Sequence, residues 1–267
     1  MTVYGRLLLN YISLVVISPV YNKCMIEALN SSFLSFAGIR KYSSNENGKF
    51  FDEVYFQYEE LKTGKLISKK YEFKKNSEII LPTIHGTVVP KEYNTLKSGD
   101  VTLEPVKVTE EEIEKLIKWY SDPEVSIPYG TFKFQLNECR AKKTLEAMIK
   151  NHGYKIMKYD EFIGIVEIKY SDEINRTANI EILIGESQYF NKGIGTKAIE
   201  MMLENIYNNT DMNNILVGIF DFNKRSINLF KKVGFEEIYI RESAYYSNGK
   251  SVDMIYVQMT RDIYNKK

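Results

Sequence analysis

The feature that most constrains the fold is the order of strand, glycine turn and helix in residues 179–198, which read N-I-E-I-L-I-G-E-S-Q-Y-F-N-K-G-I-G-T-K-A. Isoleucine at every second position of 180–184 predicts a buried strand. A polar turn follows, with Gly193 and Gly195 spaced by one residue. Apolar residues at helical intervals then predict a helix over 196–207.

The turn before this helix has the properties of an anion site. The first amides of a helix have no partner inside it, and the positive end of the peptide dipoles lies behind them. Glycines remove the side chains that would hold a phosphate away from those amides. We therefore expect an anion site at residues 191–196, suited to the pyrophosphate of a nucleotide.

Two kinds of nucleotide agree with the glycine spacing. Gly193, Gly195 and Ala198 satisfy the G-x-G-x-x-G/A fingerprint, so a NAD-dependent oxidoreductase is one alternative. In that fold the glycines normally follow the strand at once, and further strand–helix units build a doubly wound sheet. Here a long polar turn intervenes, and only one more strand and helix follow.

The same residues resemble the acetyl-CoA-binding core of the GNAT-type N-acetyltransferases, whose glycine motif is usually Gln/Arg-x-x-Gly-x-Gly/Ala. Here it reads F-N-K-G-I-G. Phe190 in the polar position, with Tyr189 before it, resembles the branch acting on aminoglycosides, polyamines, amino-sugar nucleotides and protein N-termini. A second block at 223–236, N-K-R-S-I-N-L-F-K-K-V-G-F-E, is similar to the family's next helix and Gly-Phe turn. The resemblance extends from about Gly99 to the C-terminus and implies an α/β fold with a mixed sheet, the GNAT acyltransferase fold.

The resemblance also implies an N-acetyltransferase with acetyl-CoA (coenzyme A) as its cofactor. In the family, the strand before the glycine loop carries a bulge and splays from its neighbour. Pantetheine then pairs with the freed backbone, and a backbone amide, here near Leu183, faces the thioester oxygen. The cofactor-binding residues that the resemblance implies are Ile182, Leu183, Ile184, Phe190, Asn191, Lys192, Gly193, Ile194, Gly195, Thr196, Asn223, Ser226, Asn228 and Phe230.

Acetyl transfer to an amine requires aligned reactants, donors for the oxyanion and a route for the amine proton. Several family members hold a general base where this chain has Asn179, which cannot take a proton. Glu181 lies on the same side of the strand under strict alternation and can substitute, directly or through water, or be a structural carboxylate. Where the family often has a tyrosine as general acid, this chain has Phe230. Either Tyr245 or Tyr246 therefore acts as the general acid, or the thiolate leaves unassisted. A catalytically weak CoA-binding module is a further alternative.

Acceptor specificity is expected from residues 119–134 and from the C-terminal hairpin around 241–250. Acidic groups and an aromatic wall there suit a cationic primary amine. The amine belongs to a small molecule of polyamine, aminoglycoside or amino-sugar type, or to a protein N-terminus. Core packing is the alternative role of Trp119. The substrate-binding candidates are Trp119, Tyr120, Asp122, Glu124, Glu167 and Asn179.

Length and composition agree with two domains in one soluble chain. We expect a small α+β domain of unknown role at 1–99 and the GNAT domain at 100–267. A net charge of +1 gives no electrostatic case for nucleic acid or a membrane surface. The two cysteines and two histidines lack metal-ligand spacing, and the most apolar run, 7–20, is too short for a membrane span. A cytoplasmic location follows, and a homodimer stays open.

Apolar periodicity predicts the elements of both parts. The N-terminal ones are a buried strand or helix at 7–20, a helix at 22–37, a loop at 41–49, a hairpin within 54–73 and a strand pair within 79–89. In the C-terminal part, Thr109 and Glu112 form a capping box before a helix that Asp122 and Pro123 stop. The strands expected there are 101–108, 154–159, 162–170, 215–220, 235–240 and 252–259, and the further helices are 138–151 and 224–233.

Overall fold

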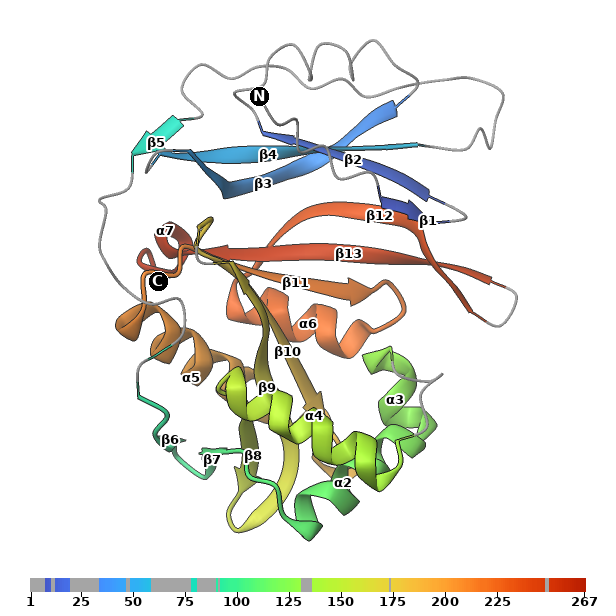
Figure 1. Ribbon diagram of the computed structural model, residues 1–267, viewed down its shortest axis with the longest axis vertical. Helices are drawn as coiled ribbons and strands as arrows, with labels where there is room; N and C mark the ends of the chain where they lie inside the picture. Colours follow the sequence, from blue (N-terminus) through green and yellow to red (C-terminus); the bar gives the residue numbers. More distant parts are fainter. Residues whose placement is uncertain are drawn as a thin grey trace.

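The computed structural model describes residues 8–10, 13–19, 34–46, 49–58, 78–80, 90, 92–130, 136–172, 174–247 and 250–267. Within these residues the chain forms two sheets (Figure 1). An eight-stranded sheet with helices packed on it takes the C-terminal part, and a five-stranded N-terminal sheet lies over one end of it. The mixed α/β architecture that the sequence predicts is confirmed.

The eight-stranded sheet has the order β12-β13-β11-β10-β9-β8-β7-β6, and all neighbours in it are antiparallel except β10 and β11. Its strands are β6 (Leu96–Ser98), β7 (Val101–Pro105), β8 (Tyr154–Lys158), β9 (Glu161–Asp172), β10 (Thr177–Ile184), β11 (Asn214–Phe220), β12 (Glu236–Ser247) and β13 (Lys250–Thr260). The helix α5 (Ile194–Asn209) connects β10 to β11, which is why this pair is parallel. The strands predicted for this part are found at their positions, and β12 is longer than predicted.

The sheet parts between β10 and β11. The two strands pair only over residues 177–179, so β10 continues to Ile184 without β11 beside it. The register with β9 shifts between Asn179 and Ile180, where β9 carries one extra residue, Lys169. Such a bulge bends a strand and increases its twist. The splayed strand is the one that the family resemblance implies, whereas the extra residue lies on its neighbour.

Alternation along β10 divides the packing into two cores. Ile180 belongs to a core shared with α5 and α6 (Lys224–Val233). Leu183 belongs to a second core on the opposite face, shared with α2 (Glu110–Ser121), α3 (Pro123–Tyr129) and α4 (Glu138–Lys150). Full burial of one large apolar side chain contributes about 1.5–3 kcal/mol. Both faces of β10 are therefore held by packing, while its edge toward β11 is open beyond residue 179.

The first helices of this part begin at caps that the sequence shows. Thr109 Oγ1 accepts from the backbone N–H of Glu112 (3.3 Å), and Glu112 Oε2 accepts from the N–H of Thr109 (3.3 Å), so the predicted capping box is confirmed. The helix α2 ends where predicted. Asp122 and Pro123 then start a new helix, α3, because the Asp122 carboxylate accepts from the N–H of Glu124 (2.9 Å) and proline suits a first helical position. The prediction contains no helix here.

The N-terminal strands form a sheet in the order β1-β2-β4-β3, with β5 beside β4. They are β1 (Leu8–Asn10), β2 (Ser13–Pro19), β3 (Leu34–Glu46), β4 (Lys49–Tyr58) and β5 (Glu78–Ile80). The predicted helix at 22–37 is wrong over 34–37, because these residues pair with β4 as part of β3. The predicted loop at 41–49 is wrong because both arms of the β3–β4 hairpin run through it. Residues 22–33, the second arm of the hairpin predicted within 54–73 and most of the strand pair predicted within 79–89 lie outside the described residues.

The two sheets contact each other through a pair of stacked rings and through hydrogen bonds to the backbone of β3. The rings of Tyr55 and Tyr239 stack with a centroid distance of 4.4 Å, and both are buried. The backbone N–H of Lys41 donates to Gln258 Oε1 (3.2 Å), and Asn214 Nδ2 donates to the carbonyl oxygen of Lys41 (2.6 Å). The N-terminal sheet therefore covers the end of the larger sheet formed by β11, β13 and β12 (Figure 1).

The larger sheet begins before residue 100. The strand β6 pairs with β7 through a tight turn at Gly99, whose φ is +61°. A division of the chain into domains at residue 99 stays a prediction. Among the described residues, no helix is long and apolar enough to cross a membrane.

A further short helix, α7 (Arg261–Tyr264), follows β13.

Candidate active site

The glycine turn lies between β10 and α5. The 3-10 helix η1 (Ser187–Tyr189) and residues 190–193 lead to α5, and Asn191 (φ 58°) and Gly193 (φ 75°) have positive φ. Asparagine tolerates this conformation, and glycine has no Cβ to oppose it. Gly193 is the N-cap of α5, and no side chain caps this helix. The first amides of α5 are therefore offered to a ligand, as the predicted anion site requires.

The two glycines have different structural roles. A Cβ on Gly195 would lie 2.6 Å from Leu229 Cδ1 of α6 and 3.6 Å from Ile182 Cδ1 of β10. A Cβ on Gly193 would meet no atom within 4 Å, so its role is the positive φ of the turn. Gly195 instead permits the close approach of α5, α6 and β10.

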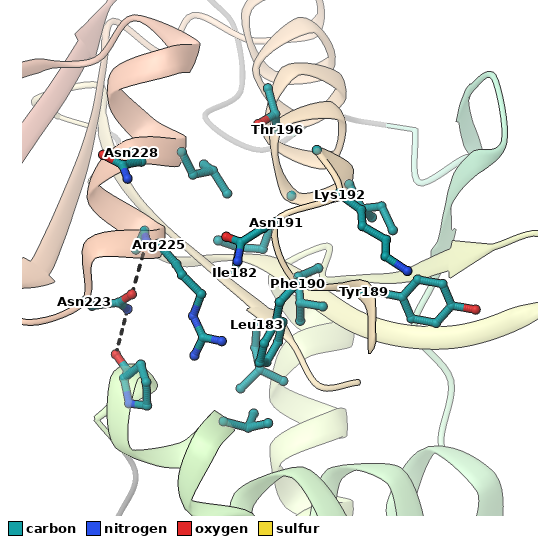
Figure 2. Close-up of a pocket in the computed structure, with 18 of the residues that line it drawn as sticks. Ile182, Leu183, Tyr189, Phe190, Asn191, Lys192, Thr196, Asn223, Arg225 and Asn228 are labelled. Atoms are coloured by element: carbon teal, nitrogen blue, oxygen red, sulfur yellow. Dashed lines mark hydrogen bonds between the residues drawn. The ribbon is translucent and has the colours of Figure 1, made fainter. Parts of the chain in front are cut away.

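The N-terminus of α6 faces the glycine turn. Asn223 is the N-cap, and its Oδ1 accepts from the N–H of Ser226 (3.1 Å). Its Nδ2 donates to the carbonyl oxygen of Pro128 (3.1 Å), which ties α6 to α3 (Figure 2). At the other end, Gly234 (φ 90°) ends the helix, as expected of the Gly-Phe turn in the second motif.

A pocket of about 300 Å³, here called the glycine-turn pocket, lies between these elements. The turn and α5 form one side and α6 forms the other (Figure 2). Every predicted cofactor residue lines it except Phe230. The structure thus brings together two motifs that are about thirty residues apart in the chain.

Three positively charged side chains among the described residues line this pocket: Lys192, Arg225 and Lys232. The Cζ of Arg225 lies 3.9 Å from the ring centroid of Phe190, a cation–π contact. Its Nη2 donates to the carbonyl oxygen of Glu124 (3.1 Å), and its Nη1 is 3.6 Å from that residue's Oε1. The predicted site lacks Arg225. Arg225 stands two residues after Asn223 in the second motif, and this position is the sequence signal that could have identified it as a site residue.

A second pocket, of about 350 Å³, lies at the parted strands and is here called the β10–β11 pocket. Residues of α2, α3, α6 and of the strands β9 to β13 line it. The two pockets adjoin, since they share part of their walls. The residues that line both are Pro128, Tyr129, Ile182, Asn223 and Ser226.

Glu181 and Asn179 both line the β10–β11 pocket, so the predicted alternation places them on one side. The Glu181 side chain is 40% exposed, and its Oε2 accepts from the Tyr129 hydroxyl (2.8 Å). Burial raises the pKa of Tyr129 well above its ordinary value, and the neighbouring Tyr120 and Glu181 add to this. Tyr129 therefore keeps its proton at neutral pH and donates to the carboxylate.

The bulged Lys169 lies between two carboxylates. Its Nζ is 3.1 Å from Glu167 Oε1 and 3.7 Å from Glu181 Oε2. Burial raises the pKa of Glu167 although Lys169 opposes the rise, and the Glu167 side chain is only 2% exposed. Burial would lower the pKa of Lys169, but the two carboxylates outweigh it and raise that pKa. Glu167 lines neither pocket, so the structure corrects its expected role from acceptor contact to partner of Lys169.

The predicted phenols and Phe230 lie on the side of the β10–β11 pocket. Tyr245 lines it and is exposed, with its ring edge-on to Phe220 at 5.1 Å. Tyr246 pairs with Ser251 on the β12–β13 hairpin, and its side chain is outside the described part. Phe230 is buried and lines this pocket rather than the glycine-turn pocket. The structure thereby corrects its assignment to the cofactor residues.

The remaining acceptor candidates are divided by the structure. Tyr120 lines the β10–β11 pocket, as expected, whereas Glu124 lines the glycine-turn pocket. Trp119 is completely buried, lines neither pocket and donates from Nε1 to Glu186 Oε1 (3.1 Å), so the interpretation as an acceptor wall is wrong and packing is correct. Asp122 also lines neither pocket, since its carboxylate caps α3.

Comparison with known proteins agrees with this arrangement. The family described as "Acetyltransferase (GNAT) domain" matches residues 100–236, more than half of the chain. No curated protein matches the chain.

Solved acetyltransferase structures match over about three fifths of this chain. The microcin self-immunity acetyltransferase MccE, in complex with acetyl-CoA and AMP, is 20% identical, with a TM-score of 0.52 over 61% of this chain and 93% of that chain. The ribosomal alpha-N-protein acetyltransferase RimL, in complex with CoA, is 15% identical, with a TM-score of 0.56 over 63% and 99%. A spermidine N-acetyltransferase chimera of SpeG from Vibrio cholerae and hSSAT is 16% identical, with a TM-score of 0.56 over 63% and 100%.

A parted sheet that leads into a glycine turn at a helix N-terminus defines the class of coenzyme A-dependent acyltransferases. This chain belongs to the GNAT acetyltransferase family. The predicted family, GNAT fold, N-acetyltransferase class and acetyl-CoA cofactor are confirmed, and the alternative of a NAD-dependent oxidoreductase is wrong. At 20% identity or less, these solved structures show a shared fold and do not identify the acceptor.

Proposed function

We propose that this enzyme transfers the acetyl group of acetyl-CoA directly to a primary amine of a small molecule or of a protein N-terminus. The observation that carries the proposal is that the two pockets adjoin along the parted end of β10. The glycine-turn pocket takes the donor and the β10–β11 pocket takes the acceptor. Ile182 and Tyr129, which line both, lie where the reactants meet. Alignment of two bound reactants is a large part of the rate enhancement in such a transfer.

The residues of the glycine-turn pocket fit coenzyme A. The phosphates of this molecule are anions, and the pocket offers the uncapped amides of α5 together with Lys192, Arg225 and Lys232. The edge of β10 beyond residue 179 has no β11 beside it, so its backbone groups suit an extended arm that pairs like a strand. Acetyl-CoA supplies there a thioester whose thiol leaves when an amine attacks.

The β10–β11 pocket holds groups that can handle the amine proton. The Glu181 carboxylate accepts that proton, directly or through water, and the Tyr129 hydroxyl holds the carboxylate in place. A backbone amide near Leu183 serves as the oxyanion donor. Tyr245 is the exposed phenol on this pocket. We assign it the role of general acid, which donates a proton to the leaving thiolate, because the ring of Phe230 has no proton to give.

Replacing Gly195 with Glu tests the donor site. The new side chain starts 2.6 Å from Leu229 Cδ1 and puts a negative charge among the amides that bind the diphosphate. We expect CoA binding to weaken by about 100-fold or more, the effect of losing one or two hydrogen bonds to a charged group, as measured by titration calorimetry. Asn208→Glu adds the same charge at the exposed end of the same helix and should bind CoA like the wild type. Unchanged affinity in Gly195→Glu would place the donor elsewhere.

A catalytically weak CoA-binding module is the alternative, because Asn179 and Phe230 occupy the family's usual base and acid positions. Release of the CoA thiol in the presence of acetyl-CoA and an amine panel separates the two. The panel contains spermidine, kanamycin, amino-sugar nucleotides and N-terminal peptides. Binding of CoA without amine-dependent thiol release would support the module. A cytoplasmic location and a homodimer stay predictions.

A further inference from the structure

The β10–β11 pocket carries little excess charge. Among the described residues, its charged lining consists of Lys169 and Glu181, and Glu167 lies buried behind Lys169. The Lys169 ammonium is 3.1 Å from one carboxylate and 3.7 Å from the other, so it is shared between them. The two carboxylates hold its pKa above the ordinary value, and it is therefore charged at neutral pH. With both carboxylates ionised, one ammonium leaves a single negative charge in excess.

Aromatic and aliphatic groups form much of the remaining wall. Tyr120 and Tyr129 meet edge to face, with ring centroids 5.9 Å apart, and Phe220 meets Tyr245 in the same way at 5.1 Å. Gly218 lets Met254 pack closely beside them, since a Cβ there would lie 2.9 Å from Met254 Sδ. Such a wall favours an apolar group, and the ring face of Tyr129, whose hydroxyl holds Glu181, adds a cation–π contact for an ammonium bound at that carboxylate.

We propose that the acceptor is a small primary monoamine whose single ammonium binds against Glu181 and whose apolar substituent packs against Phe220 and Tyr245. This inference rests on the proposed function and names its substrate class. A diamine or polyamine would bring a second ammonium toward Lys169 or onto the apolar wall. Like charges a few ångströms apart repel each other, and a buried cation without a partner is costly. The pocket therefore selects against polyamines and aminoglycosides by charge.

A matched pair of amines tests the charge argument. Hexylamine and 1,6-diaminohexane share one carbon chain and differ by one ammonium group. With acetyl-CoA and thiol detection, we expect kcat/KM to be about tenfold or more higher for hexylamine, the size of one unfavourable charge contact near a protein surface.

The outcomes of this comparison are distinct. An equal or higher kcat/KM for the diamine overturns the inference and leaves the acetyltransferase function intact. If the enzyme acetylates spermidine or an N-terminal peptide but neither hexylamine nor 1,6-diaminohexane, the inference is likewise overturned and the acetyltransferase function stays intact. If the protein binds CoA and acetylates no amine, the proposed function fails and the inference fails with it.

Lys169→Met tests which group discriminates. Without this ammonium, the second ammonium of the diamine can lie between Glu167 and Glu181, so the preference for hexylamine should fall by about tenfold. Lys142→Met removes an exposed charge on α4 and should keep the wild-type preference. An unchanged preference in folded Lys169→Met overturns the charge argument. If the variant does not fold because Glu167 loses its partner, the wild-type comparison decides.

Discussion

Replacing Glu186 with Gln should loosen the loop that joins β10 to the glycine turn. The carboxylate is nearly buried and accepts from three donors: Lys115 Nζ (2.7 Å), Lys118 Nζ (2.8 Å) and Trp119 Nε1 (3.1 Å). Burial alone would raise the pKa of Glu186, but the hydrogen bonds from these donors outweigh it and lower the pKa to about 2. The loop is thus anchored to α2 by a charge that must stay ionised. Next to it, Gly185 lies so close to the indole of Trp119 that an added Cβ would be 2.1 Å from the ring.

The size of the effect follows from the pKa. A fall from the ordinary 4.5 to about 2 corresponds to an upper limit of about 3 kcal/mol of folded-state stabilisation, at about 1.4 kcal/mol per pKa unit. The side chain of Lys118 is 59% exposed, so solvent screens its share, and we expect Glu186→Gln to lose about 2 kcal/mol at pH 7. Because the folded pKa is depressed, this stabilisation is present above pH 4.5 and disappears as the pH falls toward 2. The deficit of the variant should therefore shrink by about half at pH 3.

Urea unfolding of both proteins at a series of pH values between 7 and 3 measures this difference. Other titrating groups cancel, because only the difference between wild type and variant is followed. Glu114→Gln changes an exposed carboxylate on α2 and should stay within about 0.5 kcal/mol of the wild type at every pH. A Glu186→Gln deficit that is absent at pH 7, or that has the same size at pH 3, would refute the reasoning.

Two further predictions concern the chemistry and the donor. Glu181→Gln should lower kcat/KM for the amine by about 100-fold or more, the usual contribution of a general base, and leave CoA affinity unchanged; thiol-release rates equal to the wild type would remove Glu181 from that role. Arg225→Gln should raise KM for acetyl-CoA by about tenfold or more, because one charge-assisted contact is lost. Arg225→Lys keeps the charge and should recover part of that loss. An unchanged KM for acetyl-CoA in both variants would exclude a role of Arg225 in donor binding and leave it only its contacts with Phe190 and Glu124.

The parts of the site that depend on short-range physics could be predicted from the sequence. The glycine turn and the start of α5 with its free amides each follow from residues within one helical turn of each other. The same holds for the Thr109–Glu112 capping box, since a cap is a local hydrogen bond. Family resemblance then joined the two motifs into one cofactor site.

The parts that depend on tertiary pairing could not be predicted in this way. Residues 34–37 have apolar spacing that suits a helix, yet they are strand because β4 supplies their hydrogen bonds. The contact of Arg225 with Phe190 joins residues 35 positions apart through packing of α6 on the turn. The bulge at Lys169 depends on the register between β9 and β10, and no local residue pattern specifies that register. The last two of these features bring new chemistry to the pockets, above all the ammonium of Lys169.

Tyr129 belongs to the walls of both pockets, and its hydroxyl also holds Glu181. In the proposed function, a substitution there that reshapes the pocket of one reactant also changes the surface that the other reactant meets. Changes in acceptor preference therefore meet fewer constraints at Phe220, which lines the β10–β11 pocket and not the glycine-turn pocket. A change at Tyr129 alters the fit of both reactants, so the end of α3 is the part of the site where substitutions are least tolerated.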